Sequence, residues 1–375
     1  MIEILPVSNN SDLRKFIDYP HELYRDDPSY VPQLFTEQKA LLDKKTSPFL
    51  KHSEAAYYLA VKEGKTVGRI AAILNNNHIK FTGKQEGFFG FFDVINDYEV
   101  AKTLLDTASK WLMTHGIKKI IGPSNFSTNE TLGLLISGFD EPPFIMMPYN
   151  AAYYIILLEK YGFTKHLDLL SYFIEATDFP KELNEKAGQL EQRLAERNIT
   201  IRNIDMKNFK SDLTKFLIVY NESWAVNADF VPMTNDELMH SAKDLKTIID
   251  PDFIFFAEKN GVPIGISLTV PNVNELLIKV RRGRLLPLGV FKILFGLKEI
   301  KTVRTLALGT LPGYRRLGID LCFYYKSVQL CLRKGIRGGE ASWILENNIA
   351  MNQAIIRMNG KITHRYRLYE KGLSL

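Results

Sequence analysis

The stretch GTLPGYRRLGID occupies residues 309–320, between an apolar run at 303–308 and a run of helical periodicity that begins at Leu321. A strand that passes through glycine and basic residues into a helix leaves backbone N–H groups unpaired where the helix begins. Those groups and the positive end of the helix dipole attract a phosphate or another anion. The stretch therefore predicts a strand–loop–helix unit with an anion site, in a chain of the α/β class.

The chain repeats one pattern of strands and glycines. Residues 57–72 (YYLAVKEGKTVGRIAA) and 253–270 (FIFFAEKNGVPIGISLTV) each predict two strands joined by a tight turn. Three matching positions lie 197 residues apart: Ala60/Ala257, Gly64/Gly261 and Gly68/Gly265. A helix, a glycine and a last strand recur at Gly162 and Gly360, which are 198 residues apart. We interpret this as a duplication, with domains at 1–179 and 180–375.

The positive charge is local. The chain has 48 Lys and Arg against 42 Asp and Glu, a net charge of +6. Residues 277–304 alone hold eight Lys or Arg and one acid, Glu299. This insert predicts a lid over an acyl site, a contact with a membrane surface, or a contact with phosphates. The structural alternative is an apolar helix packed on the second domain with a solvated basic end.

Other features limit the class of protein. The first residues lack the basic and apolar regions of a signal peptide, and no uninterrupted apolar run reaches about 18 residues. Cys322 and Cys331, nine positions apart on one predicted helix, are about 13 Å apart, too far for a disulfide. The seven histidines show no metal-ligand spacing. We expect a cytoplasmic protein with no metal and no transmembrane segment.

The order Arg315-x-x-Gly318 after a strand resembles the acyl-CoA pyrophosphate loop of the GNAT superfamily of N-acyltransferases. The repeat resembles two tandem GNAT domains, each a mixed, mostly antiparallel sheet with flanking helices. The resemblance is strongest over residues 303–371. It implies an N-acyltransferase that uses acetyl-CoA or another acyl-CoA as co-substrate. The acceptor would be a small-molecule or peptide amine, acylated by direct attack.

The resemblance also implies cofactor-binding residues. Pantetheine would pair with the backbone of the fourth strand, and the pyrophosphate would lie on the amides of the loop. The implied set is Leu306, Ala307, Leu308, Tyr314, Arg315, Arg316, Leu317, Gly318, Ile319, Asp320 and Asn352.

Asp320 departs from the family, which has a small residue there. Its charge would repel a pyrophosphate about 4 Å away by about 1–4 kcal/mol, against a dipole benefit of about 0.3–1 kcal/mol. We expect weakened binding of CoA unless Arg315 or Arg316 pairs with Asp320.

Catalysis needs a base for the amine and an acid for the leaving thiolate. Glu340 is the candidate base, and Tyr325 and Tyr369 are candidate acids. A solvated carboxylate and packed aromatic rings are the structural alternatives. Ile356 stands where many GNAT enzymes carry a tyrosine.

The first repeat is predicted to be a degenerate GNAT-like domain. It has no Arg-x-x-Gly loop, and it carries acids, Asp97 and Glu99, at the corresponding helix start. Its segment 122–129 predicts either one wall of an acceptor cleft or a turn-rich connection.

Two other functions remain open. One is a catalytically inactive binding module, which Asp320 and Ile356 favour. The other is an aminoacyl-tRNA-dependent aminoacyl transferase, a class that also resembles two GNAT domains. The sequence predicts no long coiled-coil arm, which disfavours nucleic acid as a partner. Peripheral contact with a membrane also stays open.

Overall fold

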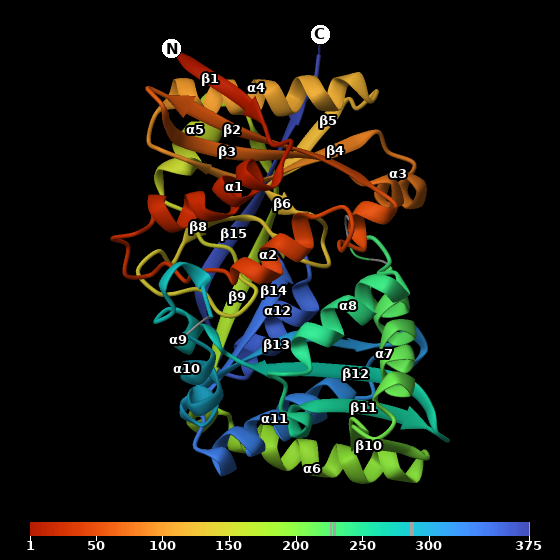
Figure 1. Ribbon diagram of the computed structural model, residues 1–375. Coiled ribbons are helices and arrows are strands. Elements are labelled where there is room, and N and C mark those ends of the chain that lie inside the picture. Colours follow the sequence, from red (N-terminus) through yellow and green to blue (C-terminus); the bar gives the residue numbers. More distant parts are fainter. Residues whose placement is uncertain (226, 228–229, 286–288, 375) are drawn as a thin grey trace. The chain divides into compact units, whose positions relative to one another are not determined.

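A computed structural model describes residues 1–374 except 226, 228–229 and 286–288 (Figure 1). The chain forms two compact units. The first comprises Met1–Leu169, Asn274–Leu294 and His364–Leu375, and the second comprises Leu170–Val273 and Phe295–Thr363. These units differ from the predicted ranges 1–179 and 180–375, which therefore stay a prediction about the two repeats along the sequence.

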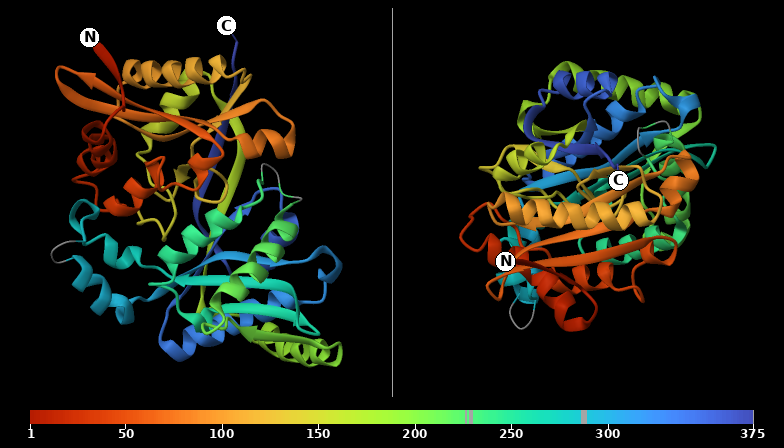
Figure 2. Two further views of the ribbon diagram at one scale, coloured as in Figure 1. Left: turned by 45° about the vertical axis from the view of Figure 1, so that its right-hand side comes forward. Right: turned by 90° about the horizontal axis from the view of Figure 1, so that it is seen from above.

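The first unit is built on a sheet in the order β1-β2-β3-β4-β5-β15, with β8 also paired to β15. Its strands are β1 (Ile2–Pro6), β2 (Glu54–Lys62), β3 (Lys65–Leu74), β4 (Glu86–Val94), β5 (Lys119–Gly122), β6 (Ser124–Asn125), β7 (Thr131–Leu132), β8 (Leu134–Ser137) and β15 (Lys361–Gly372). Its helices are α1 (Asn10–Leu23), α2 (Phe35–Leu42), α3 (Asn76–Thr82), α4 (Tyr98–Thr114), α5 (Tyr153–Tyr161) and α9 (Asn274–Leu277). Helix α4 lies along one face of this sheet in both views of Figure 2 and buries an apolar stripe that includes Leu104 and Ala108.

The second unit has the strand order β9-β14-β13-β12-β11-β10. Its strands are β9 (Thr164–Glu175), β10 (Ile199–Asn203), β11 (Ile254–Lys259), β12 (Val262–Pro271), β13 (Thr302–Thr310) and β14 (Gly338–Leu345). Its helices are α6 (Lys181–Glu196), α7 (Phe209–Trp224), α8 (Asn235–Leu245), α11 (Ile319–Lys334) and α12 (Ile349–Arg357), and α10 (Gly289–Gly296) spans the division between the units. Apolar side chains of α11, among them Val328 and Cys331, pack in the core of this unit.

The two predicted hairpins have the same register. Ala60 faces Gly68 across β2 and β3, and Ala257 faces Gly265 across β11 and β12. A register shift follows directly after each alanine. The duplicated, mixed and mostly antiparallel α/β fold predicted from the sequence is therefore confirmed.

The last strands are exchanged between the repeats. In the first unit, β5 pairs antiparallel with β15, which comes from the C-terminal repeat. In the second unit, β14 neighbours β9, which comes from the N-terminal repeat. Strands β9 and β15 each carry the chain from one unit into the other.

Candidate functional site

Strands β13 and β14 separate partway along their length. They pair in parallel from Thr302/Gly338 to Thr305/Ala341, although β13 continues to Thr310 and β14 to Leu345. On its other edge, β13 stays paired with β12, and a register shift there leaves Leu306 as an extra residue. A bulge re-aims backbone groups locally. The predicted pantetheine segment, Leu306 to Leu308, thus begins at the point where the parallel pairing ends.

Helix α11 begins without a side-chain cap. Its N-cap residue is Gly318, in the left-handed conformation with φ +80°, and its first intrahelical bond runs from the Cys322 N–H to the Gly318 carbonyl, 3.1 Å. The N–H groups of Ile319, Asp320 and Leu321 therefore precede the helical ladder. Arg316 also has positive φ, +70°. The loop has the features of an anion site that the sequence predicts.

The charged residues of this loop differ in their surroundings: one is bonded to the protein, one is exposed and one is half-buried. Arg315 donates to the Ser223 carbonyl of α7, 3.0 Å, which anchors the loop. Arg316 is exposed, and Asp320 is half-buried. Across the described part of the chain, neither Arg315 nor Arg316 pairs with Asp320. The repulsion expected between Asp320 and a bound pyrophosphate is thus not offset by an ion pair.

The matching positions of the first repeat are filled by the chain itself. Strand β4 pairs with β5 only from Glu86 to Phe88 and then continues to Val94. There, the Asn125 side-chain carbonyl accepts the Phe91 N–H at 2.6 Å. At the start of α4, Asp97 accepts the N–H groups of Glu99 and Val100. In the first repeat, side chains of the chain itself therefore accept the backbone N–H groups of β4 and α4. The start of α11 in the second repeat has no such side-chain cap.

The candidate base Glu340 is buried in a polar cluster on β13 and β14. The residue is 1% exposed, and its carboxylate accepts the Ser342 hydroxyl at 2.7 Å. The Arg304 Nε lies 3.9 Å from the same carboxylate oxygen and donates to Ser342 at 2.9 Å. A buried ion pair of this kind orders the two strands beside the point where they separate, and it leaves the catalytic role of Glu340 a prediction.

The two candidate acids have different surroundings. Tyr325 is half-buried on α11 of the second unit. Tyr369 lies in the core of the first unit, where its hydroxyl donates to Glu159 at 3.4 Å. Burial raises the pKa of Tyr369 to about 12. Tyr369 therefore has a packing role on β15, and its catalytic role stays a prediction.

Asn352 supports the end of β14 and the start of α12. Its amide nitrogen donates to the carbonyls of Leu345, Glu346 and Asn348, and its oxygen accepts the Tyr172 hydroxyl at 2.9 Å. These bonds occupy the side chain within the protein. The implied contact of Asn352 with a cofactor stays a prediction.

Two arginines of the basic insert form ion pairs within the first unit, to which residues 274–294 belong. Arg284 donates to both carboxylate oxygens of Asp18 on α1 at 2.8 Å, and its guanidinium lies 3.4 Å from the centre of the Phe35 ring. Arg282 pairs with Glu22 at 3.2 Å. The alternative of an insert packed on the second domain with a solvated basic end is therefore wrong for these arginines, because α1 supplies their carboxylates. Part of the insert, residues 286–288, lies outside the described residues.

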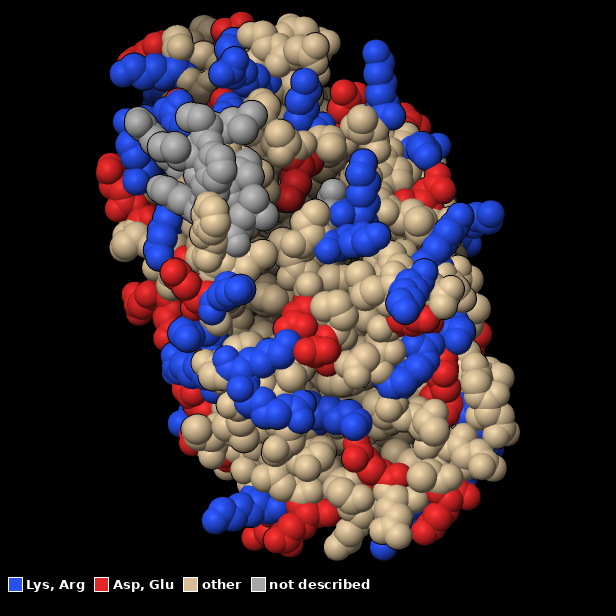
Figure 3. Space-filling model, turned by 60° about the horizontal axis from the view of Figure 1, so that its bottom comes forward, with Lys and Arg blue, Asp and Glu red and all other residues tan. Residues whose placement is uncertain are grey.

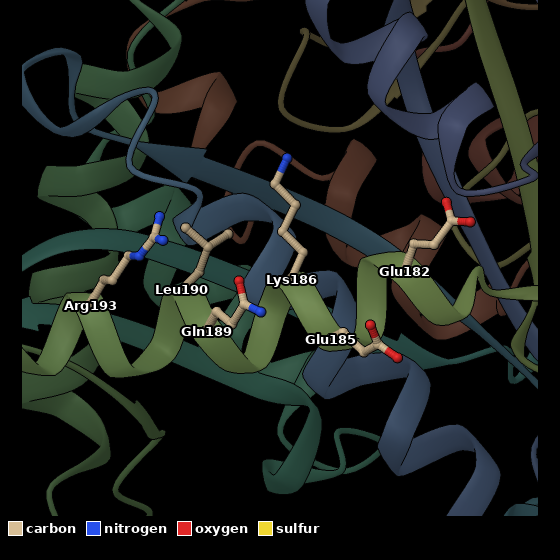
Figure 4. Close-up of a pocket in the computed structure, with 6 residues that line it drawn as sticks. All are labelled: Glu182, Glu185, Lys186, Gln189, Leu190 and Arg193. Atoms are coloured by element: carbon tan, nitrogen blue, oxygen red, sulfur yellow. The ribbon is translucent and has the colours of Figure 1, made fainter.

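Sequence reasoning missed a pocket on α6. The pocket has a volume of about 320 Å³ and is lined by Glu182, Glu185, Lys186, Gln189, Leu190 and Arg193 (Figure 4). It adjoins the predicted loop, since a Cβ added to Gly318 would lie 2.6 Å from the Leu190 Cδ1. The only signal in the sequence is the spacing of Lys186, Leu190 and Arg193, which places them on one helical face.

Charges of both signs are mixed on the face that Figure 3 shows. Figure 3 turns the lower end of Figure 1, where α6 lies, toward the reader, and shows Lys and Arg next to Asp and Glu across that face. Within the described ranges, no group of three or more His, Cys, Asp or Glu is arranged to hold a metal ion. No helix in the described part of the chain is long and apolar enough to cross a membrane.

Two known proteins are similar to this chain over almost its whole length. The chain is 35% identical to Protein YghO of Escherichia coli, over 97% of this chain and 93% of that protein. It is 32% identical to a bacterial ceramide synthase of Caulobacter vibrioides, over 99% of this chain and 98% of that protein. No family model matches the chain.

Solved structures share the fold. A tandem GNAT protein from the clavulanic acid biosynthesis pathway has a TM-score of 0.60 and 11% identity, over 100% of this chain and 99% of that one. A GCN5-related N-acetyltransferase from Sphaerobacter thermophilus has a TM-score of 0.53 and 13% identity, over 100% and 96% of the two chains. The tandem fold predicted from the repeats matches these structures along the whole chain.

Proposed function

The chain belongs to the family of Protein YghO and the bacterial ceramide synthase and has the tandem GNAT fold, and from this premise we propose that it is an acyl-CoA-dependent N-acyltransferase. The second repeat would hold the donor. The observation that carries the proposal is the parting of β13 from β14 directly before the uncapped start of α11. An extended thioester arm fits an exposed strand edge, and a pyrophosphate fits a helix start.

The name of one relative supports a proposal for the acceptor class. A ceramide is the amide of a fatty acid with a long-chain amino alcohol, and the Caulobacter vibrioides relative is named as a ceramide synthase. We therefore propose a long-chain amino alcohol as the acceptor for this chain, in place of the small or peptide amine that the resemblance alone implied.

The reaction would be direct transfer. The amine nitrogen attacks the thioester carbonyl, the carbon–sulfur bond breaks, and the products are an amide and the CoA thiol. A backbone N–H near the Leu306 bulge would stabilise the developing oxyanion. The amine loses one proton and the thiolate gains one, so a base and an acid are needed. Glu340 and Tyr325, both of the second unit, are the proposed pair.

Calorimetric titration of acetyl-CoA and a long-chain acyl-CoA into the full chain tests the donor. We expect both to bind, and Asp320→Ala to tighten binding about fivefold or more, since it removes about 1 kcal/mol of repulsion. Glu99→Ala is the matched control, because Glu99 is also an acid in the first turn of a helix, α4. That variant should bind as the wild type does. Absence of binding by both the wild type and Asp320→Ala would refute the donor proposal.

A second function is supported by the burial of Glu340 beside Arg304. A base held in an ion pair suits a module that binds acyl-CoA without turnover. Release of CoA thiol in the presence of a long-chain amino alcohol separates the two functions: thiol release at the rate of amide formation supports the enzyme. Binding without release supports the module.

A further inference from the structure

Helix α6 packs along α11. The Ala187 carbonyl lies 3.8 Å from the Cys322 Sγ, and Lys326 pairs with Glu191 at 2.9 Å. Leu190 reaches the N-cap, where its methyl group would lie 2.6 Å from a Cβ on Gly318. The face of α6 next to Leu190 therefore flanks the loop that opens α11.

The pocket on this face presents two cations. Lys186, Leu190 and Arg193 rise from the same side of α6, with Glu182 toward the start of the helix (Figure 4). Lys186 and Arg193 are exposed, and among the described residues neither has an ion-pair partner. Two turns of helix separate them, about 10 Å along the axis. Leu190, between them, touches the loop.

Two long cationic side chains beside the loop suit a ligand that carries a second anionic group next to the one at the loop. CoA carries a pyrophosphate and, on the ribose of its adenosine, a 3′-phosphate. A volume of about 320 Å³ is at the small end of ligand pockets, which fits one end of an extended molecule. The pyrophosphate is assigned above to the N–H groups of α11, so a second anion is left for the neighbouring cations.

We infer that Lys186 and Arg193 bind the 3′-phosphate of CoA, and so select 3′-phosphorylated donors. This inference rests on the proposed function, because it extends the same donor site onto α6. Phosphate pairs with arginine and lysine through charge-assisted hydrogen bonds. At an exposed site their effect is modest, about tenfold in Kd for the two side chains together.

Titration of CoA and 3′-dephospho-CoA into the full chain tests the inference. We expect the wild type to bind CoA about tenfold more tightly. The double variant Lys186→Gln, Arg193→Gln should bind the two ligands with similar affinity, and its Kd for 3′-dephospho-CoA should match that of the wild type. Lys181→Gln, a change on α6 outside the pocket, should keep the wild-type preference. Adenosine 3′,5′-bisphosphate should compete with CoA, whereas inorganic phosphate at the same concentration should not.

The outcomes separate this inference from the donor proposal. Equal binding of CoA and 3′-dephospho-CoA by the wild type, or an unchanged preference in the double variant, would overturn the inference alone. Competition by inorganic phosphate as effective as that by the bisphosphate would also overturn it, in favour of a general anion site. Absence of binding by both ligands would overturn the donor proposal and this inference with it.

Discussion

Gly318→Ala should lower the free energy of unfolding by about 2 kcal/mol. The backbone at Gly318 is left-handed, with φ +80°, which costs an alanine about 1 kcal/mol. The added Cβ would also lie 2.6 Å from the Leu190 Cδ1 and 3.1 Å from its Cδ2. Because Leu190 is a flexible side chain that can turn aside, this contact adds about 1 kcal/mol, the low end of the cost of overpacking.

Gly335 is a matched control at the other end of the same helix. It has φ +66°, and a Cβ there would have nothing within 4 Å. Gly335→Ala should therefore lose only the backbone part, about 1 kcal/mol. Urea unfolding of the full chain, followed by circular dichroism, measures both variants.

A double-mutant cycle with Leu190→Ala isolates the contact. In that background Gly318→Ala should cost no more than Gly335→Ala does, because the methyl groups are gone. Equal losses for Gly318→Ala and Gly335→Ala in the wild-type background would refute the contact between α6 and the loop. A full 2 kcal/mol loss that persists in the Leu190→Ala background would refute it as well.

Three other predictions concern buried titratable side chains. Glu340→Gln should lower the free energy of unfolding by about 3 kcal/mol, because the buried Arg304 loses its carboxylate; a loss below about 0.5 kcal/mol in urea unfolding would contradict the buried pair. The hydrogen bond from Arg202 holds the pKa of Glu258 below its ordinary value of 4.5. The ionised Glu258 therefore stabilises the fold fully above the pKa that Glu258 has in the unfolded chain. This stabilisation is lost as the pH falls through the lower pKa of Glu258 in the folded protein. Glu258→Gln should cost about 1.5–3 kcal/mol at pH 7, and this cost should shrink as the pH falls below 4.5. Burial, with the nearby Arg69 and Arg284, lowers the pKa of His21 from 6.5 to about 4. Stability should fall by about 3 kcal/mol as the pH drops from 6.5 to 4, since only unfolded His21 takes up a proton. When the free energy of unfolding is measured as a function of pH, the variant His21→Asn should not show this loss between pH 6.5 and 4.

Local patterns made the fold predictable. The glycines Gly64 and Gly261 have positive φ at the turns where the alternating runs meet. The spacing of Ala60 to Gly68 and of Ala257 to Gly265 sets the cross-strand pairs in both hairpins. Each of these signals lies within ten residues, so one sequence is enough to see it. The uncapped start of α11 was predictable for the same reason.

Long-range contacts were not predictable from these patterns. Arg284 and Asp18 are 266 residues apart, and nothing near either residue marks the other as its partner. The contact of Leu190 with Gly318 depends on how α6 packs on α11, which an amphipathic pattern does not specify. Arg315 matched a motif for phosphate, yet one of its bonds goes to the Ser223 carbonyl, because a guanidinium also stabilises the end of a helix.

The exchange of β9 and β15 has a consequence for fragments of the chain that contain only one repeat. A polypeptide that stops after the first repeat lacks the strand that pairs with β5, and one that begins at the second repeat lacks the strand beside β14. Each fragment alone would expose an unpaired sheet edge, which favours aggregation. Two fragments synthesised together can each supply the strand that the other lacks. The two repeats are thus complementary, because each contains the strand that completes the sheet of the other.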